Sequence, residues 1–524
     1  MNEINISINI DHIRDNYLTF RKITKQNNLC IPVIKGNAYG FNQIDVVYNF
    51  LNMRENPQRD FFVYSIEEAC ELRRIFGNEL NNIYCLTGPT EEQKELFLNY
   101  NIVPVINSIE QLERWCNFAI SVNKKLGFII QINLGLNRSG FQQNQLCYIK
   151  NFIEANKNNV QMLMLLSHIG CQYRLNSELG KKYTVKEFEL FDDATRYFPD
   201  VKRSLLGSFG IIIMPEGLFE SSRPGTFLFT GVLNSQGGYD FKTAITIILP
   251  VHIGEKNDEI YINFGIKHGI TTFYSKNGFI YVNGEKIFAK KVERTRTIFV
   301  VKNNKKYIKS NCLLIGNNGG DYIDGNLFSI MNESTPGEIL SRLIAGSILY
   351  PSDYKQKIIG GYPFKNIVRE YGYGIKPRNT VLFNVDGTIN RLTSTITEIR
   401  TVTDDGWCGY NATELVKPNE TIATFSFGYI DGFYRKLSNN NFSIFVKTKS
   451  NRLIECKLCG LASMDQMCFK IENKYKDKIF VGDEVVIIDT NKNILSERFT
   501  KKLGLTEEEI FYLVRTSFRV KKLN

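Results

Sequence analysis

The sequence predicts an α/β barrel in its N-terminal part and β-rich structure after it, and three observations support this division. From Ile4 to about Gly231, short apolar runs alternate with longer amphipathic stretches, as in repeated strand–helix units. A region of about 230 residues has the size of a (β/α)8 barrel. After Thr230, alternating apolar residues and glycine-containing turns indicate antiparallel strands. A doubly wound sheet is the alternative for the first part.

Apolar periodicity places the elements of the first region. The expected helices are His12–Lys25, Ile66–Phe76, Glu91–Asn99, Ser108–Asn123 and Gln142–Lys157. The expected strands are Ile31–Ile34, Phe61–Tyr64, Ile83–Leu86, Val103–Ile106, Leu126–Ile132, Met162–Leu166 and Ser204–Ser208.

The second region is expected to be mainly antiparallel. Residues from about Thr335 to Arg369 look helical in part, and Glu507–Val514 is expected to form a last helix. The expected β-segments are Thr243–Ile253, Ile260–Phe264, Ile270–Tyr274, Phe279–Val282, Thr297–Val301 and Thr393–Val402.

Bulk composition excludes several classes of protein. A chain of 524 residues with 43% hydrophobic residues predicts two or three domains with real cores. The net charge of +11 is scattered, without a basic stripe, so a nucleic-acid partner is not expected. The first sixteen residues lack the apolar core of a signal peptide, and no membrane span is expected. Eleven dispersed cysteines, including a lone C-x-x-C at Cys456 and Cys459, favour free thiols in the cytoplasm.

One stretch carries an unusual lysine. Residues 30–42 read C-I-P-V-I-K-G-N-A-Y-G-F-N, so Lys35 ends an apolar run typical of a buried strand. Desolvation at such a place disfavours the ammonium, and an unprotonated amine can bond covalently to an aldehyde. By itself the stretch is equally compatible with a strand-terminal lysine that points to solvent.

Further motifs follow in a fixed order and make the pattern specific. They are N-L-G-L-N-R-S-G-F at 133–141, L-S-H-I-G at 166–170, S-R-P-G-T at 222–226, F-G-Y-I-D-G-F at 427–433 and M-D-Q at 464–466. Together with the lysine stretch, this ordered set resembles the alanine racemase family. The resemblance implies a (β/α)8 barrel, a C-terminal β-domain and pyridoxal 5'-phosphate as cofactor.

The resemblance also implies roles for individual residues. Lys35 and Tyr429 are the expected acid–base pair on opposite faces of a substrate Cα, with His168 linking Tyr429 to Arg223. Arg223 faces the ring nitrogen of the cofactor and cannot accept its proton. The expected phosphate cradle consists of Tyr39, Ser208, Gly225 and Thr226. Arg138 is the expected ligand of the substrate carboxylate, and Met464 is expected to contact the substrate.

Partners follow from the same resemblance. In this family the β-domain of one subunit completes the barrel site of the other, so the resemblance implies a homodimer with shared active sites. The substrate is a small amino acid, with alanine as the default.

The chain departs from the family pattern in its length and at a few positions. Arg223 and Tyr429 are 206 positions apart, much further than in the family, which predicts a large insertion. The expected domains are therefore 1–231, an inserted β-rich 232–390 of unknown role, and 391–524. Within the insertion, G-G-D-Y-I-D-G at 319–325 echoes the motif at 427–432, through either duplication or chance.

Three substitutions leave the substrate open. Gln131 stands where the family has a lysine, often carbamylated, Phe518 stands at the place of a phosphate-binding tyrosine, and Gly207 replaces an asparagine. A racemase for another amino acid such as serine is therefore an alternative. A non-catalytic pyridoxal-phosphate carrier is another, although such proteins lack a β-domain with the Tyr429 and Met464 motifs. The sequence does not distinguish a biosynthetic from a catabolic role.

Overall fold

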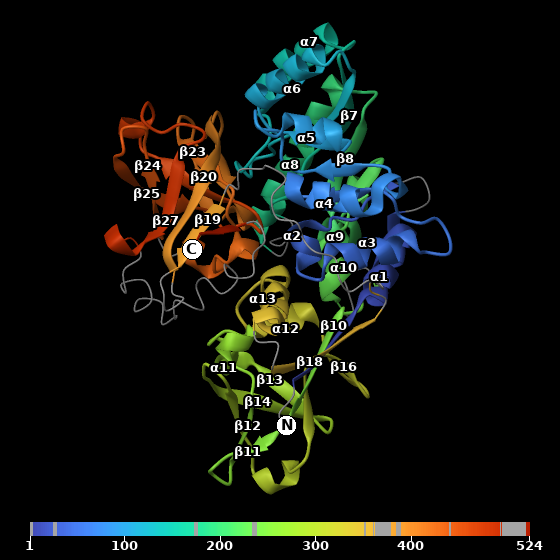
Figure 1. Ribbon diagram of the computed structural model, residues 1–524, viewed down its shortest axis with the longest axis vertical. Helices are drawn as coiled ribbons and strands as arrows, with labels where there is room; N and C mark the ends of the chain where they lie inside the picture. The colour runs from blue at the N-terminus through green and yellow to red at the C-terminus, as the bar shows by residue number, and fades with distance from the viewer. Residues whose placement is uncertain are drawn as a thin grey trace.

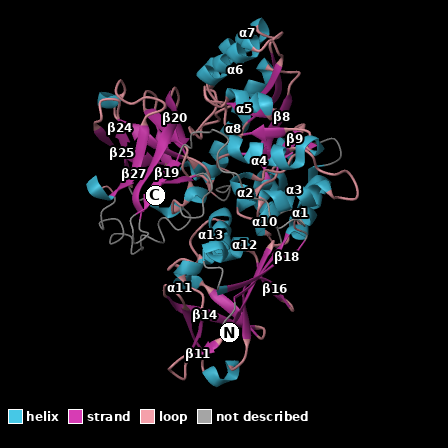
Figure 2. Cartoon of the chain, in the orientation of Figure 1, coloured by secondary structure: helices cyan, strands magenta, loops and turns pink. Residues whose placement is uncertain are grey.

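The computed structural model of the chain contains a barrel and two large β-sheets (Figures 1 and 2). It describes residues 4–24, 29–171, 177–232, 238–349, 353–359, 361, 379–383, 389–439, 442–492, 494 and 520–523. The expected helix Glu507–Val514 and Phe518 lie outside these ranges. All eleven cysteines are free thiols, and no described helix combines the length and apolar character needed to cross a bilayer.

The barrel confirms the predicted fold class. Eight parallel strands pair in the order β2-β9-β8-β7-β6-β5-β4-β3, and a parallel bridge between Val33 and Phe62 joins the two ends of the sheet. Apolar side chains from successive strands fill the interior, among them Val33, Phe62 and Val105. The strands are β2 (Leu29–Cys30), β3 (Phe61–Val63), β4 (Ile83–Cys85), β5 (Ile102–Ile106), β6 (Leu126–Gln131), β7 (Val160–Leu166), β8 (Lys202–Gly207) and β9 (Ser221–Arg223).

Amphipathic helices surround this barrel and bury their apolar faces against it (Figure 2). Ser65 caps α4 with a capping box completed by Glu68, which is the signal expected at a helix start. The helices are α1 (Ile10–Thr24), α2 (Lys35–Tyr39), α3 (Gln43–Leu51), α4 (Ile66–Phe76), α5 (Lys94–Asn99), α6 (Ile109–Ser121), α7 (Leu146–Ala155), α8 (Glu178–Tyr197), α9 (Ser208–Ile213) and α10 (Thr226–Thr230).

A first β-module, defined here as β1 with residues 245–359, lies at the bottom of Figure 1. Its sheet includes β1, the strand that precedes the first barrel helix, between β10 and β18. The expected β-segment Ile270–Tyr274 is not a strand, because the chain turns there and enters α11. The elements are β1 (Ile4–Asn9), β10 (Ile245–Pro250), β11 (His252–Ile253), β12 (Glu259–Ile262), α11 (Tyr274–Asn277), β13 (Phe279–Val282), β14 (Glu285–Val292), β15 (Thr297–Val300), β16 (Asn311–Asn318), β17 (Asp321–Ile323), α12 (Gly325–Met331), α13 (Pro336–Leu349) and β18 (Tyr354–Ile359).

A second β-module, defined as the described part of residues 379–523, lies beside the barrel at the left of Figure 1. It has a hydrophobic core of its own, whereas the barrel and the first β-module share one continuous core. Its strands are β19 (Asn379–Phe383), β20 (Ile389–Thr401), β21 (Gly406–Cys408), β22 (Glu414–Val416), β23 (Thr421–Phe425), β24 (Ser443–Lys447), β25 (Leu453–Cys459), β26 (Met467–Ile471), β27 (Glu484–Asp489) and β28 (Val520–Leu523).

Candidate active site

Lys35 begins a tight turn of left-handed backbone at the end of the first barrel strand. Gly36, Asn37, Ala38 and Tyr39 all have φ between 54° and 63°, a region that non-glycine residues occupy at a cost of about 1–2 kcal/mol each. Surrounding contacts offset this strain. The buried Glu68 accepts a hydrogen bond from the Asn37 amide at 3.0 Å, and Asn37 Oδ1 accepts one from the Gln43 amide at 3.0 Å. Backbone strain held in this way is characteristic of functional sites.

The amine of Lys35 meets a carboxylate from the second β-module. Lys35 Nζ lies 2.5 Å from Asp465 Oδ2, and the side chains are 16% and 4% exposed. At the neighbouring Gly36, a Cβ atom would overlap the Met464 side chain and lie 2.9 Å from Ile430 Cγ1. Close approach of the second β-module to the lysine turn therefore requires glycine at position 36.

Arg223 ends β9 and is buried among oxygen acceptors. Its guanidinium donates to Ser204 Oγ, to the Ser167 carbonyl, and to the Leu205 carbonyl at 3.4 Å. Burial lowers the pKa of Arg223 to about 9, which still leaves the group charged at neutral pH. The acceptors hold the guanidinium in one orientation, so the site has a fixed positive charge.

His168 and Arg138 converge on Tyr410 of the second β-module. Arg138 Nη1 donates to the Tyr410 hydroxyl at 3.1 Å, and the His168 ring meets the Tyr410 ring edge-on at 5.6 Å between centroids. Burial, followed by the charges of Arg138, Arg223 and Lys35, holds the pKa of His168 well below its usual range, so the ring is neutral. Among the described residues no hydrogen bond joins His168 to Tyr429 or Arg223, unlike the expected relay.

Tyr429 lies on a short 3-10 helix, η9 (Tyr429–Asp431), that follows β23. Its hydroxyl oxygen is 3.1 Å from the place that a Cβ on Gly337 would occupy, beside the Tyr39 ring. Burial, then the nearby Tyr39, raises the pKa of Tyr429 well above its usual value, although Arg435 acts in the opposite direction. The phenol therefore keeps its proton at neutral pH.

A polar corner forms where β8 and β9 end. Ser208 Oγ accepts hydrogen bonds from the Gly225 amide at 2.8 Å and the Phe227 amide at 3.3 Å. A Cβ on Gly225 would lie 2.7 Å from the Tyr39 hydroxyl, so the backbone there is open to a bound group only because the residue is glycine. The Gly225 amide, expected to face phosphate, is directed at Ser208 in this structure.

These groups open onto one cavity of about 600 Å³ that is lined by the barrel, by the second β-module and by the α12–α13 segment of the first β-module. It is lined by all ten predicted site residues, which are Lys35, Tyr39, Arg138, His168, Ser208, Arg223, Gly225, Thr226, Tyr429 and Met464. The lining also includes Gln131, whose amide donates to Ser139 Oγ at 3.0 Å. The sequence analysis assigned no role to Asp465, Tyr410 and Arg435, although M-D-Q was one of its motifs.

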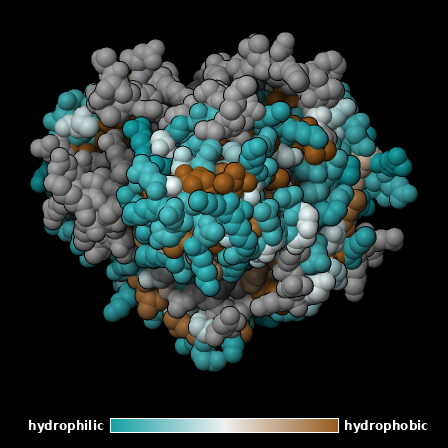
Figure 3. Space-filling model, turned by 90° about the horizontal axis from the view of Figure 1, so that it is seen from below, coloured by the Kyte–Doolittle hydropathy of each residue, from teal (hydrophilic) through white to brown (hydrophobic). Residues whose placement is uncertain are grey.

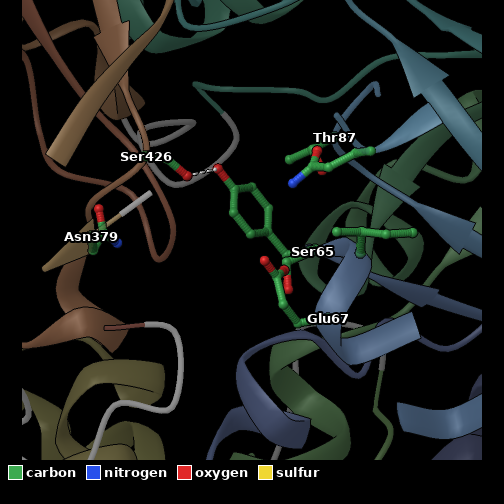
Figure 4. Close-up of a pocket in the computed structure, with 8 residues that line it drawn as sticks. Ser65, Glu67, Thr87, Asn379 and Ser426 are labelled. Atoms are coloured by element: carbon green, nitrogen blue, oxygen red, sulfur yellow. Dashed lines mark hydrogen bonds between the residues drawn. The ribbon is translucent and has the colours of Figure 1, made fainter. Parts of the chain in front are cut away.

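The second β-module is attached firmly at this mouth of the barrel. Asn137 Nδ2 donates to the Trp407 carbonyl at 3.0 Å, and the Gly409 amide donates to the Leu136 carbonyl at 2.9 Å. A small neighbouring cavity of about 30 Å³ marks the same junction, where Tyr64 and Ser426 share a hydrogen bond of 3.0 Å (Figure 4). Tyr429 and Met464 line the cavity beside Lys35 of the same chain, and the supply of these two residues by a second subunit stays a prediction.

Comparisons with known proteins agree with this geometry. Residues 8–232 match the model of the alanine racemase N-terminal domain, and residues 389–523 match that of the alanine racemase C-terminal domain. The curated alanine racemase of Rickettsia typhi is 24% identical over 483 residues, covering 92% of this chain and 90% of the relative. That of Rickettsia canadensis is 27% identical over 294 residues, covering 54% of this chain and 80% of the relative.

Solved structures give the same fold. The alanine racemase of Bartonella henselae with covalently bound pyridoxal phosphate has a TM-score of 0.57 at 22% identity, covering 68% of this chain and 100% of that chain. The alanine racemase of Streptomyces lavendulae has a TM-score of 0.57 at 16% identity, covering 69% of this chain and 98% of that chain.

Proposed function

This chain belongs to the alanine racemase family, and from that premise we propose that it interconverts L- and D-alanine with pyridoxal phosphate as cofactor. The observation that carries the proposal is that Lys35 of the barrel and Tyr429 of the second β-module line one cavity with Arg138 and Arg223. Inversion at Cα needs an acid–base group on each face of the substrate, and the amine and the phenol are contributed to the cavity by two different domains.

The residues present fit the cofactor. Lys35 offers an amine at the end of a barrel strand, Gly225 leaves room beside Ser208, and the buried Nε of Arg138 has no hydrogen-bond partner within the described chain. When bound, pyridoxal phosphate supplies an electron sink that makes the Cα hydrogen of an amino acid acidic. Lys35, Tyr39, Arg138, His168, Ser208, Arg223, Gly225 and Thr226 are the residues that would hold it.

The protein's own groups then determine where protons go. Lys35 Nζ pairs with Asp465, which holds the amine in place as the proton-transfer group for one face of Cα. Tyr429 keeps its proton at neutral pH and can give it to the other face. Arg435 lowers the cost of the phenolate that forms, which permits the reverse direction.

Two arginines and one methionine of the site favour a small amino acid as the substrate. Arg138 can bind a carboxylate through its guanidinium, whose planar fork suits that geometry. Arg223 stays charged and does not take up the proton of a ring nitrogen, which favours reprotonation at Cα over loss of carbon dioxide. Met464, 3% exposed, closes the space directly over Gly36 on the lysine side of the cavity.

The test is a panel of L-amino acids incubated in D2O, followed by chiral separation of the products. We expect deuterium at Cα in both enantiomers of alanine, and loss of this exchange and of bound-cofactor absorbance in Lys35→Ala. Faster inversion of serine than of alanine would assign the substrate to serine instead. Cofactor binding without exchange into any amino acid would indicate a carrier protein.

A further inference from the structure

The sheets of the two β-modules have the same strand order. Apart from the short strands β11 and β17, which the first sheet has in addition, the order in the first is β12-β15-β14-β13-β16-β10-β1-β18, and in the second it is β23-β26-β25-β24-β27-β20-β19-β28. Numbered along the chain within each module, these two orders are one and the same permutation. Every neighbouring pair is antiparallel except the last, β1–β18 and β19–β28, which is parallel in both. A match of order and direction over eight strands indicates two copies of one fold.

The loop that carries Tyr429 also has a counterpart. Residues 264–270 read F-G-I-K-H-G-I and residues 427–433 read F-G-Y-I-D-G-F, each starting two positions after its strand, β12 or β23. The first glycines have φ −143° and −142°, and the closing glycines have φ 111° and 117°.

The two loops share one further internal contact. In each loop the third residue of the 3-10 helix accepts a hydrogen bond from the first glycine amide, at 2.9 Å to His268 Nδ1 and at 3.0 Å to Asp431 Oδ2. Ile266 therefore occupies the position of Tyr429, and the first copy lacks the phenol. The echo at 319–325 is a different feature, because it forms the turn between β16 and β17 and the start of α12.

The two copies stand in different relations to the barrel. The first is continuous with it, through β1 into α1 and through α10 into β10, and shares its core. Its helix α13 reaches the lysine turn, where Ser341 Oγ donates to the Tyr39 carbonyl at 3.2 Å. The second copy covers the mouth of the barrel and brings Tyr429 and Met464 there.

The copies also contact each other through buried groups. Glu338 on α13 is 1% exposed and accepts a hydrogen bond from the Arg435 amide at 3.2 Å. Arg342, also 1% exposed, lies over the Tyr434 ring at 5.0 Å. Each of these buried charged side chains has a partner in the other copy, as buried charges require, so α13 and the second module pack together at this junction.

We propose that the first β-module is a duplicate of the C-terminal β-domain. In this chain the first β-module takes the place that a subunit's own β-domain has beside its barrel. The C-terminal copy takes the place that the partner subunit's β-domain has in a homodimer. One chain then contains a complete active site and works as a monomer. The chain thus combines one barrel with two β-domains, in place of the two barrels and two β-domains of a homodimer. The lower face of the first module, seen in Figure 3, is mostly hydrophilic, as expected of a surface left in water. The proposal rests on the proposed function only for the role of Tyr429.

The first test does not depend on activity. Light scattering of the purified full chain is expected to give the mass of one chain, 60.3 kDa, at micromolar concentration. A zero-length carbodiimide reagent should join Lys436 to Glu333, whose side chains pair across the two copies, within a band of single-chain mass. A stable particle of twice the mass, or a Lys436–Glu333 link found only in a double-mass band, would overturn the proposal.

The second test is complementation. Lys35→Ala and Tyr429→Phe chains are co-expressed with different tags and purified together. A homodimer with shared sites would rebuild one intact site per mixed pair and recover roughly a quarter of wild-type activity. The single-chain site predicts no activity above that of the separate variants. If wild-type chain lacks racemase activity on every amino acid while the mass and cross-link results hold, the proposed function fails and the duplication stands.

Discussion

The two β-modules present equivalent loops on two sheets of the same strand order, yet of Ile266 and Tyr429 only Tyr429 lines the candidate active site. Ile266 and Tyr429 sit at equivalent points between a strand and a closing glycine, with nearly equal backbone angles on either side. Two positions further along, His268 of the first module replaces Asp431 of the second as the acceptor for the amide of the loop's first glycine. The backbone scaffold is thus separable from the function, which depends on the side chain presented and on what it faces.

The largest expected difference between the modules is in catalysis. Tyr429→Phe removes the proton donor of one face and should lower kcat by about 10²–10⁴-fold. Ile266→Val, the matched change in the first module, should leave kcat within about twofold, because nothing in the mechanism uses that position. Steady-state racemisation of both variants measures the contrast. Equal losses in the two would show that the loops are not functionally distinct.

The junction between the modules should control stability. Glu338→Ala removes the acceptor of the Arg435 amide and leaves Arg342, 3.8 Å away, as a buried charge without its carboxylate, a change that typically costs about 3–5 kcal/mol of unfolding free energy. Urea titration followed by circular dichroism measures it. A midpoint unchanged from wild type would mean that α13 and the second module do not depend on each other.

Acid should destabilise the first module through His268. Burial lowers the pKa of His268 to about 4 from its ordinary 6.5, although the Asp353 hydrogen bond acts the other way. The unfolded chain therefore takes up the proton first as pH falls. The contribution of neutral His268 to the unfolding free energy is fully present above pH 6.5. It falls by about 3 kcal/mol as the pH drops from 6.5 to 4. His268→Asn should flatten this part of the stability profile, and an equally steep profile in that variant would assign it to other groups.

The smallest effect is expected at the exposed bridge between the modules. Lys436 pairs with Glu333, and both side chains are about one-third exposed. Lys436→Ala should therefore cost less than about 1 kcal/mol and leave the mass of the particle unchanged. Thermal unfolding with light scattering on the same sample checks both points. A loss of unfolding free energy as large as that of Glu338→Ala would contradict the assignment of the buried Glu338 contact as the main one between the modules.

The barrel, and the gathering of the predicted site residues around one cavity, were predictable because strand ends carry the motifs. Lys35 and His168 each follow a short apolar run, and in a parallel barrel such ends meet at one face. The strand that ends at Arg223 reads Ser-Ser-Arg and has no apolar run to mark it. The predicted helix Ile66–Phe76 agrees with α4 because its cap and periodicity are both local signals. Helix α8 was not predicted.

The remaining features depend on contacts that are distant in sequence. Asp465 was within a recognised motif, but its pairing with Lys35 joins positions 430 residues apart. The left-handed turn after Lys35 is imposed by Glu68 and Gln43, which no local propensity reveals. The duplication was hidden because the equivalent loops share only phenylalanine and two glycines. The more similar stretch at 319–325 forms a turn, strand β17 and the start of α12 instead.

The most direct measurement of the central claim is racemisation rate per chain as the holoenzyme is diluted from micromolar to below nanomolar concentration. A site formed by Lys35 and Tyr429 of one chain predicts a constant rate per chain across the whole series. A rate that falls with dilution and recovers on addition of the inactive Lys35→Ala chain would show that the phenol comes from a second molecule.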